Sequence, residues 1–76
     1  MNVFIVMQTV DIEVIGLNVF HDGVEAARCF EDLCDRNQAI EENNLTHELP
    51  GTLRIAGDDA YAVQLIQRHV SGLVAT

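Results

Sequence analysis

The first twenty residues carry the densest apolar pattern of the chain. Val, Ile and Phe dominate two stretches, residues 3–10 and 13–20, with a break near Asp11. These residue types favour β-strands, so the pattern predicts two strands. Apolar and polar positions do not alternate cleanly in either stretch. We therefore expect both faces of this strand pair to need cover.

An amphipathic helix is predicted from Asp22 to about Arg36. Asp22 and, three residues later, Glu25 form the pattern that caps exposed N–H groups at a helix start. Asn37 suits the left-handed position that follows a helix. One helical arc is apolar and holds Ala26, Ala27, Phe30, Leu33 and Cys34. Because acidic side chains occupy the opposite arc, this helix is expected to pack on a sheet.

The second half of the chain predicts a loop, two short strands and a final helix. Residues 38–44 are polar, and residues 45–49 and 52–56 each alternate around Pro50-Gly51, a pair suited to a type II turn. A helix from Asp58 to about Gly72 is predicted by an apolar stripe at spacings of three and four. The stripe consists of Ala62, Val63, Ile66, Val70 and Leu73.

The predicted order is strand-strand-helix-strand-strand-helix. Hairpin-linked strands and two amphipathic helices favour an α+β fold: a single-layer, mostly antiparallel sheet of about four strands with two helices packed on one face. At 76 residues, the chain is expected to form a single domain over residues 1–76.

Charge narrows the classes of partner. The chain has 12 acidic residues, four arginines, no lysine and a net charge of -8. Such a composition excludes nucleic-acid binding by a basic surface and argues against anionic membranes. The apolar N-terminal run is short, follows no basic residue and is interrupted by polar residues farther along, which predicts neither a secretory signal nor a membrane span. A cytoplasmic setting is expected.

Candidate chemistry is sparse. Cys29 and Cys34 are five residues apart on the predicted helix and point about 140° apart, which predicts no disulfide between them. The glycines are scattered and no lysine can reach a phosphate, while the three histidines match no zinc spacing. A buried thiol is favoured for Cys34 over a nucleophile. We therefore expect no catalytic residues, no metal, no cofactor and no enzyme activity.

Two predicted surfaces remain. The first, which we call the acidic face, consists of Glu25, Glu31, Asp32, Asp35, Glu41 and Glu42. It is interpreted either as a partner surface or as a solvating face that keeps the protein soluble. The second is an interface stripe on the outer side of the predicted final helix, formed by Tyr61, Leu65 and Arg68. Tyr and Arg are enriched at binding hot spots, so the stripe predicts an interface.

These features favour a small acidic protein-binding module that forms a homodimer and blocks a surface on a larger protein partner, such as a basic, nucleic-acid-binding protein. In size, acidity and lack of lysine the chain resembles many phage or mobile-element inhibitors, including anti-CRISPR and other nucleic-acid-mimicking proteins; the resemblance is one of type. The alternative is an obligate homo-oligomeric structural or assembly subunit with a merely solvating acidic face. Acidity that reflects a salt-loving or GC-rich source is a third explanation.

Overall fold

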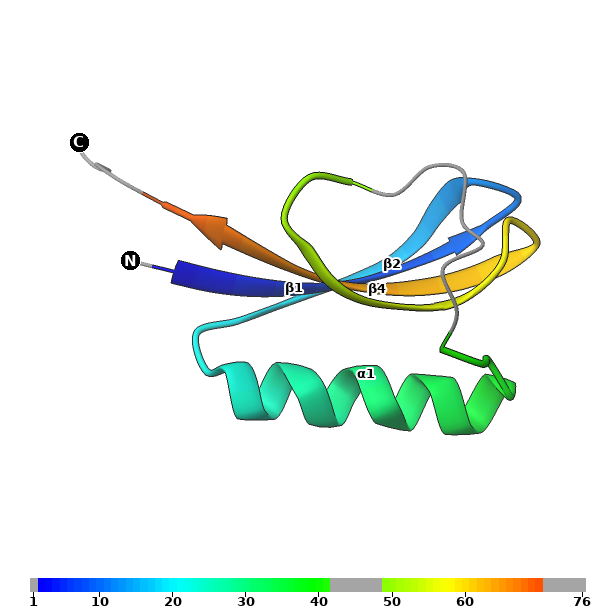
Figure 1. Cartoon of the computed structure of the whole chain (residues 1–76), viewed down its shortest axis with the longest axis horizontal. Coiled ribbons are helices and arrows are strands. Elements are labelled where there is room, and N and C mark those ends of the chain that lie inside the picture. The colour runs from blue at the N-terminus through cyan, green and yellow to red at the C-terminus, as the bar shows by residue number, and fades with distance from the viewer. Residues whose placement is uncertain (1, 42–48, 71–76) are drawn as a thin grey trace.

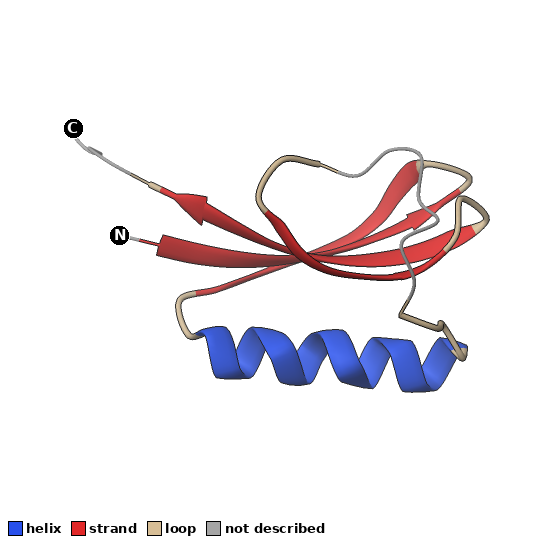
Figure 2. Ribbon diagram, viewed as in Figure 1, coloured by secondary structure: helices blue, strands red, loops and turns tan. Residues whose placement is uncertain are grey.

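The computed structural model describes residues 2–41 and 49–70. Its elements are β1 (Asn2–Val10), β2 (Glu13–Phe20), α1 (Gly23–Asn37), β3 (Thr52–Gly57) and β4 (Tyr61–His69) (Figure 1). The strands form one antiparallel sheet in the order β2-β1-β4-β3. Helix α1 runs along one face of this sheet (Figure 2).

The predicted first hairpin is confirmed. Strands β1 and β2 join through Asp11 and Ile12, whose φ angles of 50° and 63° are those of a primed turn that follows the twist of the two strands. The pairing shifts where Gln8 faces Gly16 and Thr9 faces Val14. Ile15 is therefore the extra residue of a β-bulge in β2.

The predicted helix start is also confirmed. Asp22 accepts a hydrogen bond of 2.8 Å from the Val24 N–H and caps α1. The left-handed residue after the helix is Gln38, with φ 56°, so the predicted position at Asn37 is one residue early. Ala26 and Phe30 are the fully buried residues of α1 and face the sheet.

The predicted final helix is wrong, because residues 61–69 form strand β4. The described residues therefore contain four strands and one helix, a mostly β architecture rather than an α+β layer with two helices on one face. Strand β4 lies between β1 and β3 and is covered on both faces. Five of its consecutive residues are buried: Ala62, Val63, Gln64, Leu65 and Ile66. A central strand produces such an uninterrupted run, within which helical spacings also occur.

Asp58 caps a turn instead of a helix. Its Oδ1 accepts hydrogen bonds from the Ala60 and Tyr61 N–H groups, at 2.9 and 3.2 Å. Its own N–H donates to the Tyr61 carbonyl, which closes the β3–β4 hairpin. Asp58 therefore binds the N–H groups that follow it, but the backbone there turns back into the sheet instead of forming the predicted helix.

The region before β3 is partly described. The predicted strand at residues 52–56 is confirmed as β3, whereas the predicted strand at residues 45–49 falls almost entirely outside the described residues. The predicted turn at Pro50-Gly51 is confirmed: Gly51 has φ 85° and the Thr52 N–H donates to the Leu49 carbonyl.

The core lies mainly between α1 and the sheet. The buried side chains of this cluster are Val6, Ala26, Phe30, Ala56, Val63 and Leu65. On the opposite sheet face, Ile55, Gln64 and Ile66 are also buried, close to the turn that precedes β3. The Oε1 atom of Gln64 accepts hydrogen bonds from the Leu49 N–H and the Thr52 hydroxyl, both at 3.3 Å. The turn before β3 thus covers part of this sheet face, next to β3 and β4.

Candidate interaction surfaces

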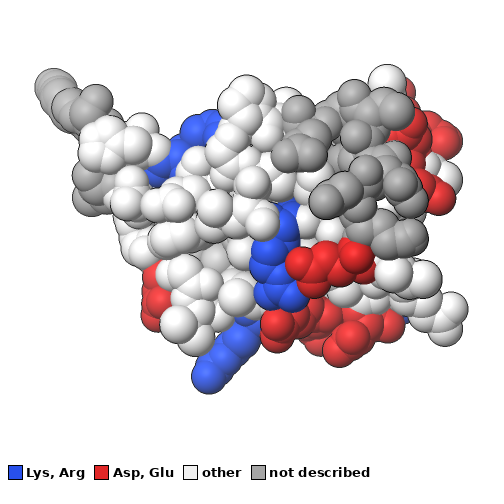
Figure 3. Space-filling view, viewed as in Figure 1, with Lys and Arg blue, Asp and Glu red and all other residues white. Residues whose placement is uncertain are grey.

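The acidic face lies along α1 and the residues just after it. Glu25, Glu31, Asp32 and Asp35 are exposed on the helix and Glu41 is exposed beyond its end, whereas Glu42 lies outside the described residues. Figure 3 shows Asp and Glu side chains gathered around Arg side chains on the α1 side of the molecule.

Arg54 of β3 binds two members of the acidic face. Its Nε and Nη2 atoms donate to the two carboxylate oxygens of Glu41, at 3.0 and 2.8 Å. Its Nη1 donates to Glu31 at 3.1 Å, and its guanidinium carbon lies 4.7 Å from the centre of the Phe30 ring. A bidentate carboxylate pair and a cation–π contact are strong, directional interactions. Arg54 therefore fixes the chain after α1 to the sheet.

These ion pairs change the electrostatics of the acidic face. Hydrogen bonding from Arg54 lowers the pKa of Glu41, and the same bond raises the pKa of Arg54. Asp32 pairs with Arg36 one helical turn later, at 3.1 Å. Three of the described carboxylates are thus held by arginines of the same chain. The use of this face as a partner surface stays a prediction.

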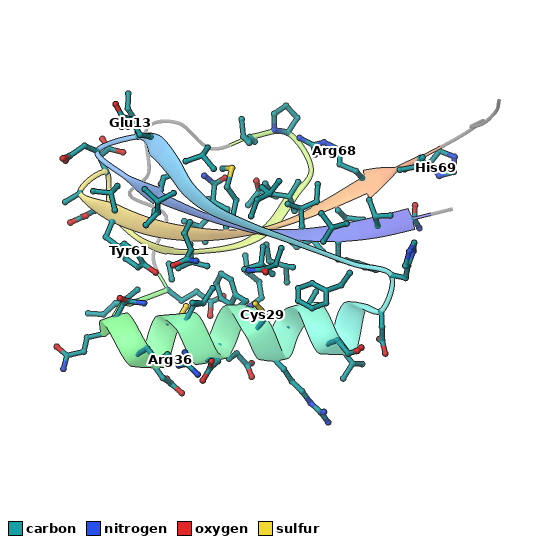
Figure 4. The ribbon with its side chains drawn as sticks, turned by 180° about the vertical axis from the view of Figure 1, so that it is seen from behind. Glu13, Cys29, Arg36, Tyr61, Arg68 and His69 are labelled. Atoms are coloured by element: carbon teal, nitrogen blue, oxygen red, sulfur yellow. The ribbon has the colours of Figure 1, made fainter. Side chains whose placement is uncertain are left out.

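The predicted interface stripe does not form, because its residues lie on a strand. Alternation places Tyr61 and Leu65 on the face of β4 toward α1 and Arg68 on the opposite face (Figure 4). Leu65 is buried in the core, and the Tyr61 hydroxyl donates to Gln8 Oε1 at 2.9 Å. Arg68 donates to the Pro50 carbonyl. The helical spacing that suggested a common stripe therefore has no counterpart in the structure.

Cys29 and Cys34 are free thiols that lie half-buried on α1. Burial raises the pKa of both, and the negative charges of Asp32 near Cys29 and of Glu41 near Cys34 raise it further. Both groups are thus protonated at neutral pH, which disfavours nucleophilic chemistry. Within residues 2–41 and 49–70, no group of three or more His, Cys, Asp and Glu side chains could hold a metal ion.

Strand β2 presents an apolar surface that the sequence-based search for sites did not single out. It is an outer strand of the sheet, and its exposed side chains include Val14, Ile15, Leu17 and Val19, each 57–58% exposed. Residues 14–20 contain no charged residue and no proline. The sequence indicated an uncovered apolar surface, since the first strand pair lacked clean alternation. It did not show that β2 lies at a sheet edge.

The backbone edge of β2 is also open. Among the described residues, no hydrogen bond reaches β2 from any segment other than β1. At the other edge of the sheet, the Gly57 N–H of β3 donates to the Ile40 carbonyl at 2.8 Å. The two outer strands therefore differ in how their backbone groups are satisfied.

No protein family, curated protein or solved structure matches this chain. In the described part of the chain, α1 is too short and too polar to cross a membrane.

Proposed function

We propose that this chain is a small protein-binding module that acts through the outer edge of β2. The observation that carries the proposal is the coincidence, on one strand, of an open backbone edge with four apolar side chains that are more than half exposed. The partner is a protein that contributes an extended segment or a strand edge of its own.

Physical reasons support strand addition at this site. An unpaired strand edge offers a row of N–H and C=O groups that another chain can use, and alternate side chains add apolar contacts. Edges that must stay free usually carry lysine, proline, an inward charge or a β-bulge. Residues 14–20 of β2 carry no lysine, proline or charge. Glu13 places a charge at the start of the strand, and the bulge at Ile15 is the one protective feature within it.

The acidic face supports a partner surface less well. Arg54 and Arg36 already bind Glu31, Glu41 and Asp32, so these carboxylates would have to exchange an existing ion pair for a new one. Exposed ion pairs contribute little, typically below about 1 kcal/mol, so such an exchange gains little. Inhibition of a basic, nucleic-acid-binding partner through this face stays a prediction.

Site-specific photo-cross-linking tests the proposal. The photoreactive residue p-benzoylphenylalanine replaces either Leu17 on β2 or Leu53 on β3, in cells that express the chain. The two leucines are matched, since both lie on outer strands and are 57% and 54% exposed. Illumination is expected to give covalent protein adducts from position 17 and few or none from position 53, as read by gel mobility and mass spectrometry.

Two results would contradict the proposal. One is the absence of adducts at position 17, which would mean that no protein occupies the β2 edge. The other is equal labelling from positions 17 and 53, which would mean that the cross-links report random encounters rather than a site on β2.

A further inference from the structure

We propose that the occupant of the β2 edge is a second copy of this chain, paired antiparallel with β2 about a two-fold axis. The two four-stranded sheets then join into one continuous sheet of eight strands. This inference rests on the proposed function, because it names the partner of the same edge.

The symmetry of the contact determines how such an assembly ends. A two-fold contact uses the same patch on both copies and closes after two chains. The outermost strands of the dimer are then the two β3 strands, which the Ile40 carbonyl and the Arg54–Glu41 ion pair already hold. Pairing through β2 uses the same edge of both copies and therefore stops at the dimer.

Charge permits a second copy at this edge. Each copy carries a net charge of -8, so two copies repel wherever their acidic surfaces meet. Residues 14–20 are uncharged, and the acidic side chains of α1 lie on the helix rather than on the β2 edge. Two copies can therefore meet along β2 without placing carboxylates opposite each other, which is unfavourable across paired strands.

The geometry also brings apolar side chains together. Pairing with β1 places Leu17 opposite Met7 and Val19 opposite Ile5, on the sheet face away from α1. A two-fold axis perpendicular to the sheet keeps both helices on one face. It also brings the Leu17 and Val19 side chains of both copies together on the other face. Such apolar pairs stabilise neighbouring strands, in addition to the new backbone hydrogen bonds.

Sedimentation equilibrium at micromolar concentration tests the dimer, with two matched variants. The wild type is expected at twice its 8.4 kDa mass. Leu17→Lys places two lysines in the dimer interface and should raise the dissociation constant about 100-fold or more. Leu53→Lys makes the same change at nearly the same exposure on β3, and should leave the constant within about threefold. Circular dichroism verifies that both variants stay folded.

Salt provides a second readout with a characteristic sign. Because two chains of charge -8 repel each other, added salt screens the repulsion and should tighten the dimer. Binding of the acidic face to a basic partner would weaken under the same change.

The outcomes separate this inference from the proposed function. A wild-type chain that sediments as a monomer, or a Leu17→Lys variant that dimerises like the wild type, overturns the β2 dimer. If position 17 nevertheless cross-links to a different protein, the binding module stands and only the second copy is wrong. If position 17 gives no adduct at all, both fail.

Discussion

The two outer strands of the sheet differ in length, in the contacts made to them and in the side chains that they expose. Strand β3 is six residues long, with a shifted register around Leu53 and Gly57 at its end. Residues after α1 hold it from outside, through the Ile40 carbonyl and Glu41. Strand β2 is eight residues long and exposes apolar side chains, and its bulge at Ile15 is the one irregularity that its register shows.

The β3 edge is contacted by a chain segment outside the strand. The segment that follows α1 reaches β3 and supplies a carbonyl and a carboxylate to it. The described residues of that segment, 38–41, form no backbone hydrogen bond with β2, which is separated from β3 by β1 and β4. An edge that nothing else in the described chain contacts is a surface where another protein can pair.

The largest expected effect on stability comes from a substitution at Gly57, which we compare with the same substitution at Gly16. Gly57 at the end of β3 has φ 93°, and an added Cβ would lie 2.1 Å from the Tyr61 carbonyl oxygen. Gly57→Ala should therefore lower the free energy of unfolding by at least about 2 kcal/mol. Gly16 of β2 has no positive φ, and an added Cβ meets the flexible end of Gln8. Gly16→Ala should cost less than about 1 kcal/mol.

Urea unfolding at one protein concentration, followed by circular dichroism, measures both glycine variants. If Gly16→Ala destabilised the protein as much as Gly57→Ala, the backbone of β2 would be as tightly constrained as that of β3, and the contrast between the strands would fail.

A smaller effect is expected when Arg54 is replaced. Arg54→Gln removes the bidentate pair with Glu41, the contact with Glu31 and the stacking on Phe30, and should cost about 1–2 kcal/mol. Arg36→Gln is the control, because its pair with Asp32 is exposed and should contribute less than about 0.5 kcal/mol. The amide of Gly57 should also exchange its hydrogen faster in the Arg54 variant. Equal losses of stability in the two variants would show that Arg54 does not hold the β3 edge.

The smallest effect is a pH dependence at Glu41. Its pKa is lowered in the folded state by the hydrogen bonds from Arg54, so its contribution is present above the usual pKa of 4.5. That contribution is lost as the pH falls through the lowered value. Glu41→Gln should cost a few tenths of a kcal/mol at pH 7, since the pair is partly exposed, and nothing at a pH below both values. Urea midpoints of both proteins from pH 7 to pH 2 measure this convergence. If the difference between the two urea midpoints grew toward acid pH, the effect of Glu41 on stability would have the opposite sign to the one expected.

Local signals made the first half of the fold predictable. The strands at residues 3–10 and 13–20 and the cap at Asp22 follow from neighbouring residues alone. The segment after Asp58 was assigned wrongly because its apolar positions fit a helical period as well as a doubly covered strand. What distinguishes the two is the placement of this segment between β1 and β3, which is a property of the whole chain.

The surfaces were harder to predict for the same reason. Arg54 and Glu31 are 23 positions apart, so no local pattern shows that the arginine partly neutralises the predicted acidic face. Tyr61 and Arg68 share a helical face but lie on opposite faces of a strand. The exposed apolar residues of β2 were visible as a pattern without alternation. Their meaning depends on the strand order, which puts β2 at the edge.

The pairing of β1 with β4 has a consequence for how the protein forms on the ribosome. Asn2 pairs with His69, so the sheet cannot close until nearly all of the described chain has been synthesised. Until β4 arrives, the first hairpin has both of its edges unpaired. Contacts so distant in sequence slow folding, and hairpins exposed in this way are prone to pair with one another. The order of synthesis therefore leaves this hairpin exposed to mispairing until β4 has been made.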